Sequence, residues 1–83
     1  MKFRVNVNVM PHKTLLDPQG KAVQKIIHNQ GYNSVDNVRI GKHITFEIEA
    51  DSEEKATSLA NDIAKEILIN PVIEEYSLSI QPL

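Results

Sequence analysis

Residues 2–9 of the chain read KFRVNVNV, a stretch in which polar and apolar side chains alternate without a break. Successive side chains of a β-strand point to opposite faces of a sheet, so Phe3, Val5, Val7 and Val9 would share one face. The segment predicts a strand that is buried on one side. Such a strand needs further elements to cover its apolar face.

A helix is predicted after this strand, over residues 18–30. Asp17 can accept a hydrogen bond from the first turn, and Pro18 suits a first helical position because its missing N–H would be unpaired there anyway. Gly31 supplies a residue that readily adopts the left-handed conformation at a helix end. The apolar residues recur at helical spacing, at positions Ala22, Val23, Ile26 and Ile27.

A hairpin is predicted next, because two short apolar sets flank a turn signal at Gly41 and Lys42. Val38 and Ile40 share one face before the turn, and Ile44, Phe46 and Ile48 share one face after it. A two-residue loop would oppose Ile40 to polar His43. A three-residue loop over 41–43 keeps the apolar residues on one side.

A second helix is predicted over residues 53–69, with Asp51 and Glu54 as a capping box at its start. Asn70-Pro71 would end this helix, and a last strand follows in which Tyr76, Leu78 and Ile80 alternate with polar residues. The helical stripe consists of Ala56, Leu59, Ala60, Ile63, Ala64, Ile67 and Leu68.

The resulting order is β-α-β-β-α-β, which predicts an α+β, ferredoxin-like fold. We expect a four-stranded antiparallel sheet of strand order 4-1-3-2, with both helices on one face, in a single domain over residues 1–83. In that topology the connections 16–20, 39–43 and 70–73 meet at one end of the sheet. A functional surface is expected at that end.

Composition excludes several classes of function. Nine basic and eleven acidic residues give a net charge of −2 without a basic stripe, so nucleic acid is not an expected partner. The chain has no cysteine, which excludes a disulfide framework, a thiolate zinc site and a cysteine nucleophile. The N-terminus lacks the continuous apolar core of a signal peptide, and no apolar run could cross a membrane. We expect a cytoplasmic protein.

The side chains that often carry chemistry are dispersed in this chain. His12, His28 and His43 lack the spacing and the acidic companions of a metal site. Glu47 and Glu49 are expected on a solvated strand face, where nothing would raise a carboxyl pKa for acid-base work. No glycine-rich phosphate-binding loop is encoded. The sequence therefore predicts no catalytic, cofactor-binding or metal-binding residue.

Two other binding functions occur in proteins of the same topology. RNA-binding domains of this order need aromatic side chains on the open sheet face, whereas Phe46 shares a face with Ile44 and Ile48 and is expected in the core. A regulatory domain that binds a small molecule requires only a loop and a subunit interface. That alternative stays open on these grounds.

Three segments carry a resemblance to a known family: 16–23 (LDPQGKAV), 38–42 (VRIGK) and 70–74 (NPVIE). In order and at these separations, they closely resemble the PurS family, the small subunit of phosphoribosylformylglycinamidine synthase. The resemblance spans the chain. It implies a non-catalytic subunit, dimeric, that bridges a large synthetase subunit and a glutaminase subunit in purine biosynthesis. It also implies that the partner subunits, not this chain, use ATP, magnesium and glutamine.

The resemblance and the expected topology together nominate a set of partner-contact residues. Several of them also have a purely structural explanation, because they could cap a helix, relieve backbone strain as glycines, or end a helix. Arg39 and Lys42 are expected to point outward, where a guanidinium could pair with a partner's carboxylate. The full set is Asp17, Gln19, Gly20, Arg39, Gly41, Lys42, Asn70 and Pro71.

Self-association is expected because a domain of 83 residues has a small core and its sheet leaves two edge strands. Pro82 discourages pairing near the end of the last strand. The stretch 34–39 carries no such block, so the second strand or its hairpin is the predicted interface.

Overall fold

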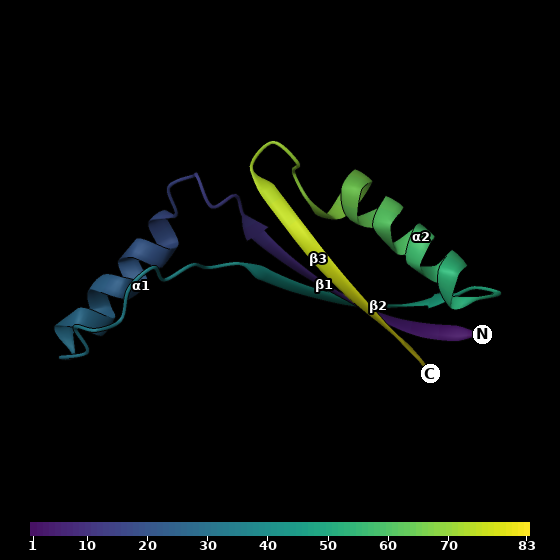
Figure 1. Ribbon diagram of the computed structural model, residues 1–83, viewed down its shortest axis with the longest axis horizontal. Helices are drawn as coiled ribbons and strands as arrows, with labels where there is room; N and C mark the ends of the chain where they lie inside the picture. The colour runs from purple at the N-terminus through teal and green to yellow at the C-terminus, as the bar shows by residue number, and fades with distance from the viewer.

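The computed structural model describes residues 1–83 and contains three strands and two helices. Figure 1 shows their arrangement. In chain order the elements are β1 (Lys2–Pro11), α1 (Pro18–Asn29), β2 (Lys42–Glu49), α2 (Glu53–Ile63), a π-helical turn (Ala64–Leu68) and β3 (Glu74–Pro82).

The core lies between the central strand and α2. β1 pairs antiparallel with β2 on one side and with β3 on the other, so the strand order is β2-β1-β3. Phe3, Val5, Val7 and Val9 are each at most 1% exposed, as the alternation in residues 2–9 predicts. α2 meets this face with alanines, which allow the helix to approach closely. These are Ala56, Ala60 and, in the following turn, Ala64, all fully buried.

The predicted fold class is wrong, because the sheet has three strands and the order 4-1-3-2 does not occur. The missing strand is the first half of the predicted hairpin. The N–H of Val38 donates to Gln24 Oε1 (3.2 Å), and the N–H of Ile40 donates to Asp17 Oδ2 (2.8 Å). These backbone donors are used by side chains of α1 and its cap, so they are not available to a neighbouring strand. Asn37, at φ 54°, also interrupts the extended run.

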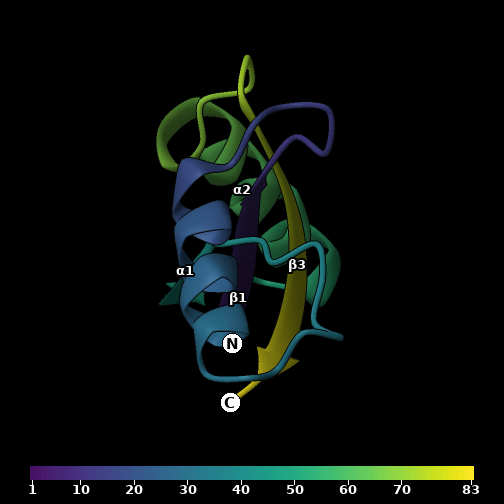
Figure 2. The same ribbon diagram turned by 90° about the vertical axis from the view of Figure 1, so that its left-hand side faces the viewer.

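The predicted placement of both helices on one face is wrong as well. α1 lies beyond the end of the sheet and only α2 packs along it (Figures 1 and 2). Residues 30–41 return beside α1 toward β2 (Figure 1). Gly20 is the one buried residue of α1.

The helix boundaries fall close to the predicted ones, but one cap differs. α1 ends at Asn29 and Gly31 follows at φ 97°. Ser52, not Asp51, caps α2, and its Oγ accepts a hydrogen bond from the N–H of Lys55 (3.2 Å). Asp51 forms an ion pair with the Lys55 side chain instead (3.4 Å).

Candidate functional site

Asp17 joins the start of α1 to the segment that leads into β2. A residue before proline favours extended backbone, and Asp17 has φ −113° and ψ 91°, as an N-cap requires. Its Oδ1 accepts the N–H of Gly20 (2.9 Å), and its Oδ2 accepts the N–H of Ile40 (2.8 Å). One carboxylate thus holds together two segments that are 23 residues apart.

The surroundings of Asp17 keep its carboxylate ionised. The hydrogen bond from Gly20 N–H, then the one from Ile40 N–H, lowers the pKa of Asp17 below its usual value, and the nearby charge of Arg39 adds to this effect. Partial burial acts in the opposite direction. A carboxylate held in this state accepts hydrogen bonds and is not suited to acid catalysis.

Arg39 does not point outward as predicted. Its Nη2 donates to the carbonyl of Pro11 (2.7 Å) and to the carbonyl of His12 (3.1 Å), and its Nε lies 3.6 Å from Asp17 Oδ2. The guanidinium therefore ties the end of β1 to the segment before β2. These contacts occupy much of the guanidinium group. Arg39 therefore has a structural role that its position in the sequence did not indicate.

Gly20 and Gly41 lie where a side chain would not fit. A Cβ at Gly20 would collide with the carbonyl of Val38. A Cβ at Gly41 would collide with the backbone carbonyl of Val9 and with the side chain of Met10. Both glycines permit a close approach of backbone segments.

Lys42 and the 70–74 segment meet through Glu74, which sequence reasoning did not nominate. Lys42 Nζ lies 3.3 Å from Glu74 Oε2, while Glu74 Oε1 accepts the N–H of Asn70 (2.8 Å). The Asn70 hydrogen bond, and then Lys42, lowers the pKa of Glu74. Asn70 Oδ1 in turn accepts the N–H of Val72 (3.1 Å). The only sequence signal for Glu74 was its position at the end of the NPVIE segment.

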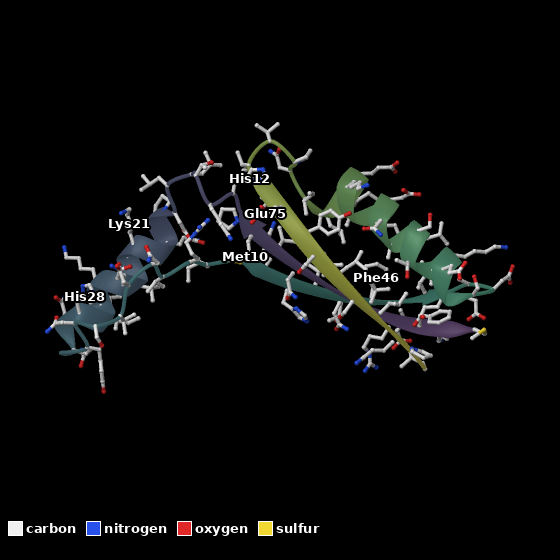
Figure 3. The ribbon with its side chains drawn as sticks, in the orientation of Figure 1. Met10, His12, Lys21, His28, Phe46 and Glu75 are labelled. Atoms are coloured by element: carbon white, nitrogen blue, oxygen red, sulfur yellow. The ribbon has the colours of Figure 1, made fainter.

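The first loop completes this end of the molecule. The N–H of His12 donates to the carbonyl of Ile73 (3.0 Å), and His12 Nε2 lies 3.1 Å from the carbonyl of Pro71. Its Nδ1 lies 3.7 Å from Glu75 Oε2, and Figure 3 shows the two side chains near Met10, while Lys21 and His28 lie apart on α1. The three segments that carry the resemblance therefore lie at one end of the sheet.

A groove of about 570 Å³ opens between these segments. Its floor is mainly apolar, and charged groups of Asp17, Lys42 and Glu74 stand along it. Of the nominated residues, Asp17, Gln19, Gly41 and Lys42 line it, whereas Gly20, Arg39, Asn70 and Pro71 lie outside its lining. The lining residues are Val9, Pro11, Leu15, Leu16, Asp17, Pro18, Gln19, Ile40, Gly41, Lys42, Ile73 and Glu74.

The side chains that line this groove are suited to binding and not to catalysis. Its two carboxylates are both engaged by backbone amides, and its lysine is paired with one of them. No cluster of three or more potential metal-binding side chains occurs in the molecule. Neither helix has the length and apolar character needed to span a bilayer.

Comparison with known proteins identifies the family. Residues 4–82 match the family model described as PurS, phosphoribosylformylglycinamidine (FGAM) synthase. The chain belongs to the PurS family. The subunit PurS of Bacillus subtilis phosphoribosylformylglycinamidine synthase is 38% identical over 79 residues, which cover 95% of this chain and 93% of that protein. The family indicated by the three segments is thereby confirmed.

Solved PurS structures have the same fold as this chain. A chain in the structure of PurLQS from Thermotoga maritima has a TM-score of 0.90 and 30% identity, covering 98% of this chain and 99% of that one. B. subtilis PurS has a TM-score of 0.85 and 38% identity, with coverages of 96% and 99%. The chain, in which α1 extends beyond the sheet, is therefore closely similar overall to experimentally determined PurS structures.

Proposed function

We propose that the chain is the non-catalytic small subunit of phosphoribosylformylglycinamidine synthase and bridges the ATP-dependent synthetase subunit and the glutaminase subunit. The observation that carries this proposal is the match over nearly the whole chain to PurS, together with the likeness to a chain of the PurLQS structure. Within it, ATP, magnesium and glutamine are used by the partner subunits. The complex would act in purine biosynthesis in the cytoplasm.

The chemistry of the chain supports a binding role. It has no cysteine for glutamine hydrolysis, and the carboxylates at its candidate site are engaged in hydrogen bonds with backbone amides. A glutaminase needs an activated nucleophile and an ATP-dependent synthetase needs phosphate-binding groups. Neither set of groups is assembled at the groove, so activity would reside in the partners.

The groove end is the proposed contact surface for a partner subunit. Leu16 and Ile73 offer apolar area beside it, being 68% and 47% exposed, and Lys42 offers a charge that is 58% exposed. Apolar area surrounded by charged groups is typical of protein interfaces. In this proposal Gln19, Gly41 and Lys42 face the partner, along with Asn70 and Pro71. Asp17, Gly20 and Arg39 hold the surface in shape.

Self-association is a further part of this proposal, because the chain is unusually extended for its size. Its radius of gyration is 16.4 Å, whereas about 12 Å is typical of a compact domain of this length. Only eight residues are buried. A second copy would supply part of the apolar contact that a single chain lacks.

Omission of this chain from a reconstituted enzyme tests the proposed function. The synthetase and glutaminase subunits of the same complex are assayed with and without it, using either glutamine or ammonia as the nitrogen source. We expect glutamine-dependent turnover to require the chain and ammonia-dependent turnover of the synthetase to proceed without it. Equal glutamine-dependent turnover in its absence would overturn the bridging role, and glutamine hydrolysis by the chain alone would overturn the non-catalytic assignment.

A further inference from the structure

The charges of this chain are unevenly distributed. Residues 12–41 contain four basic and two acidic residues, a formal net charge of +2. The rest of the chain contains five basic and nine acidic residues, a formal net charge of −4. Because α1 extends beyond the sheet, the basic part also lies apart from the acidic part in space (Figure 1).

Two lysines of this basic part share one face of α1. Lys21 and Lys25 are about one helical turn apart and lie on the side of the helix opposite Val23. Both line a shallow hollow of about 400 Å³ on the surface of α1. The helix contains no acidic residue. The lining of the hollow, here called the basic face, consists of Lys21, Gln24, Lys25, His28 and Asn29.

The two lysines of the basic face have no carboxylate partner within the chain. Three other lysines lie 3.3–3.8 Å from a carboxylate oxygen, whereas neither Lys21 nor Lys25 forms an ion pair. The acidic residue on the neighbouring segment is Asp36. Its Oδ1 accepts hydrogen bonds from Gln24 Nε2 (3.2 Å) and from the N–H of Asn37 (2.9 Å). The positive charge of the basic face is therefore not neutralised locally.

The stability of the helix does not explain Lys21. The N-terminal turn of a helix carries a partial positive charge, so acidic side chains are favoured there and cations are not. α1 has no acidic residue in its first turn, and Lys21 is the fourth residue of the helix. A residue that opposes the local preference without a gain within the fold is typical of a functional position.

A subunit that bridges two others needs two separate contact surfaces. The groove end is the proposed surface for one partner, and it is mainly apolar. On the outer face of the sheet, polar groups pair with each other, as Arg4 does with Glu47 (3.8 Å) and Asn8 with His43 (2.6 Å). A cation that an interface desolvates needs an anion from the partner. The unpaired lysines therefore make the basic face the candidate for the second surface.

We infer that the basic face of α1 binds an acidic surface on one partner subunit, while the groove end binds the other. This inference rests on the proposed bridging function and names the chemistry of its second contact. Opposite charges on two surfaces speed their encounter and disfavour wrong partners. Nucleic acid does not suit this face, because two lysines do not form the longer basic stripe that a phosphate backbone requires.

Charge reversal in the reconstituted enzyme tests the inference. The chain is titrated into fixed amounts of both partner subunits, and its half-maximal concentration for glutamine-dependent turnover reports its affinity. Lys21→Glu/Lys25→Glu should raise this concentration by about tenfold or more. Lys21→Arg/Lys25→Arg keeps both charges and should behave as the wild type. Lys55→Glu/Lys65→Glu makes the same change of charge on and beyond α2, and it should stay within about threefold of the wild type.

Ionic strength provides a second readout. Salt screens exposed charges, with a Debye length of about 10 Å at 0.1 M. The half-maximal concentration of the wild type should rise between about 50 mM and about 300 mM salt, and the rise should be smaller for Lys21→Glu/Lys25→Glu. Circular dichroism controls for loss of α1, which should stay helical because a glutamate suits its first turn.

Pull-down with each partner subunit tagged in turn tests the division of the two surfaces. Lys42→Glu should reduce recovery of one partner, and Lys21→Glu/Lys25→Glu should reduce recovery of the other. Loss of the same partner with both variants would overturn the division. Light scattering of the isolated chain is the control, since a loss of self-association with Lys21→Glu/Lys25→Glu would overturn the inference by placing the basic face between two copies.

The outcomes separate this inference from the proposed function. An unchanged half-maximal concentration and salt dependence for Lys21→Glu/Lys25→Glu would overturn the inference and leave bridging intact. Equal weakening by the arginine and glutamate pairs would overturn it as well, because charge would not be the recognised property. Competition between a labelled DNA duplex and assembly at physiological salt would overturn it in favour of nucleic acid. Bridging itself is overturned only when wild-type glutamine-dependent turnover does not need the chain.

Discussion

Replacement of Gly20 by alanine should destabilise the protein, although the same change inside most helices is stabilising. In an unconstrained helix, alanine is favoured over glycine by about 1 kcal/mol. At Gly20 the added Cβ would collide with the carbonyl of Val38 and lie 2.8 Å from Asp17 Oδ2. Overpacking of this kind typically costs about 1–3 kcal/mol. The backbone cannot move aside without stretching the 2.8 Å and 2.9 Å hydrogen bonds of Asp17.

Because the obstructing carbonyl belongs to the backbone, the cost should lie in the upper part of this range, about 2–3 kcal/mol. Subtraction of the gain of about 1 kcal/mol leaves a net loss of roughly 1–2 kcal/mol, or a fall in Tm of about 5–15 °C for a domain of this size. Thermal unfolding at one fixed protein concentration measures it, since the Tm of an associating protein depends on concentration. The neighbouring exposed variant Gln19→Ala is the control and should stay within about 0.5 kcal/mol of the wild type. A Gly20→Ala protein as stable as the wild type would refute the close packing of Gly20 in α1 against the backbone of Val38.

Two further predictions concern charges at the same end. The folded-state pKa values of Asp17 and Glu74 lie below their usual values of 3.8 and 4.5. The two carboxylates therefore contribute fully to stability at pH values above 3.8 and 4.5, respectively. This contribution is lost as the pH falls through the lower pKa values of the folded state. Urea midpoints measured from pH 7 to pH 2 should decline at the acid end of this range, and the decline should be shallower for Asp17→Asn than for the wild type. The same dependence of the midpoint on pH in both proteins would contradict the assigned hydrogen bonds of Asp17. Arg39→Ala should cost about 1.5–3 kcal/mol because it removes charge-assisted hydrogen bonds to two carbonyls, whereas Lys42→Ala should cost less than about 0.5 kcal/mol. Denaturant unfolding compares the two, and equal costs would argue against a structural role for Arg39.

Local patterns predicted those elements whose residues follow one dominant rule. The alternation in residues 2–9 predicted β1 because each valine of that strand is buried against α2. The pair Asp17-Pro18 predicted the start of α1 because capping depends on neighbours in the sequence. In such segments local preference and tertiary packing agree.

The predictions failed where long-range contacts compete with the local pattern. Val38 and Ile40 alternate as in a strand, but Gln24 and Asp17 take their N–H groups. The alternation does not encode whether a backbone N–H donates its hydrogen bond to a neighbouring strand or to a side chain. For the same reason Arg39 was expected to face solvent, and its two carbonyl partners, 27 and 28 residues away, left no local signal.

The candidate site was accessible to sequence reasoning in part. The three segments that carry the family resemblance do meet at one end, through contacts among Asp17, Ile40 and Gly20 and through the Lys42–Glu74 pair. The predicted four-stranded sheet gave the wrong reason for that meeting, because β2 begins only at Lys42. Which of these residues touch a partner subunit stays a prediction.

Binding of Lys42→Glu to the partner subunits tests the proposed contact surface most directly. Lys65→Glu, an exposed change beyond α2 and outside the groove, is the matched control. Loss of one partner of a charge pair that an interface desolvates typically costs about 2–5 kcal/mol, so Lys42→Glu should weaken assembly by roughly 30-fold or more. In the reconstituted enzyme, glutamine-dependent turnover should fall with Lys42→Glu and persist with Lys65→Glu, and ammonia-dependent turnover should persist with both. Normal assembly and normal glutamine-dependent turnover with Lys42→Glu would contradict the assignment of the groove as the bridging surface.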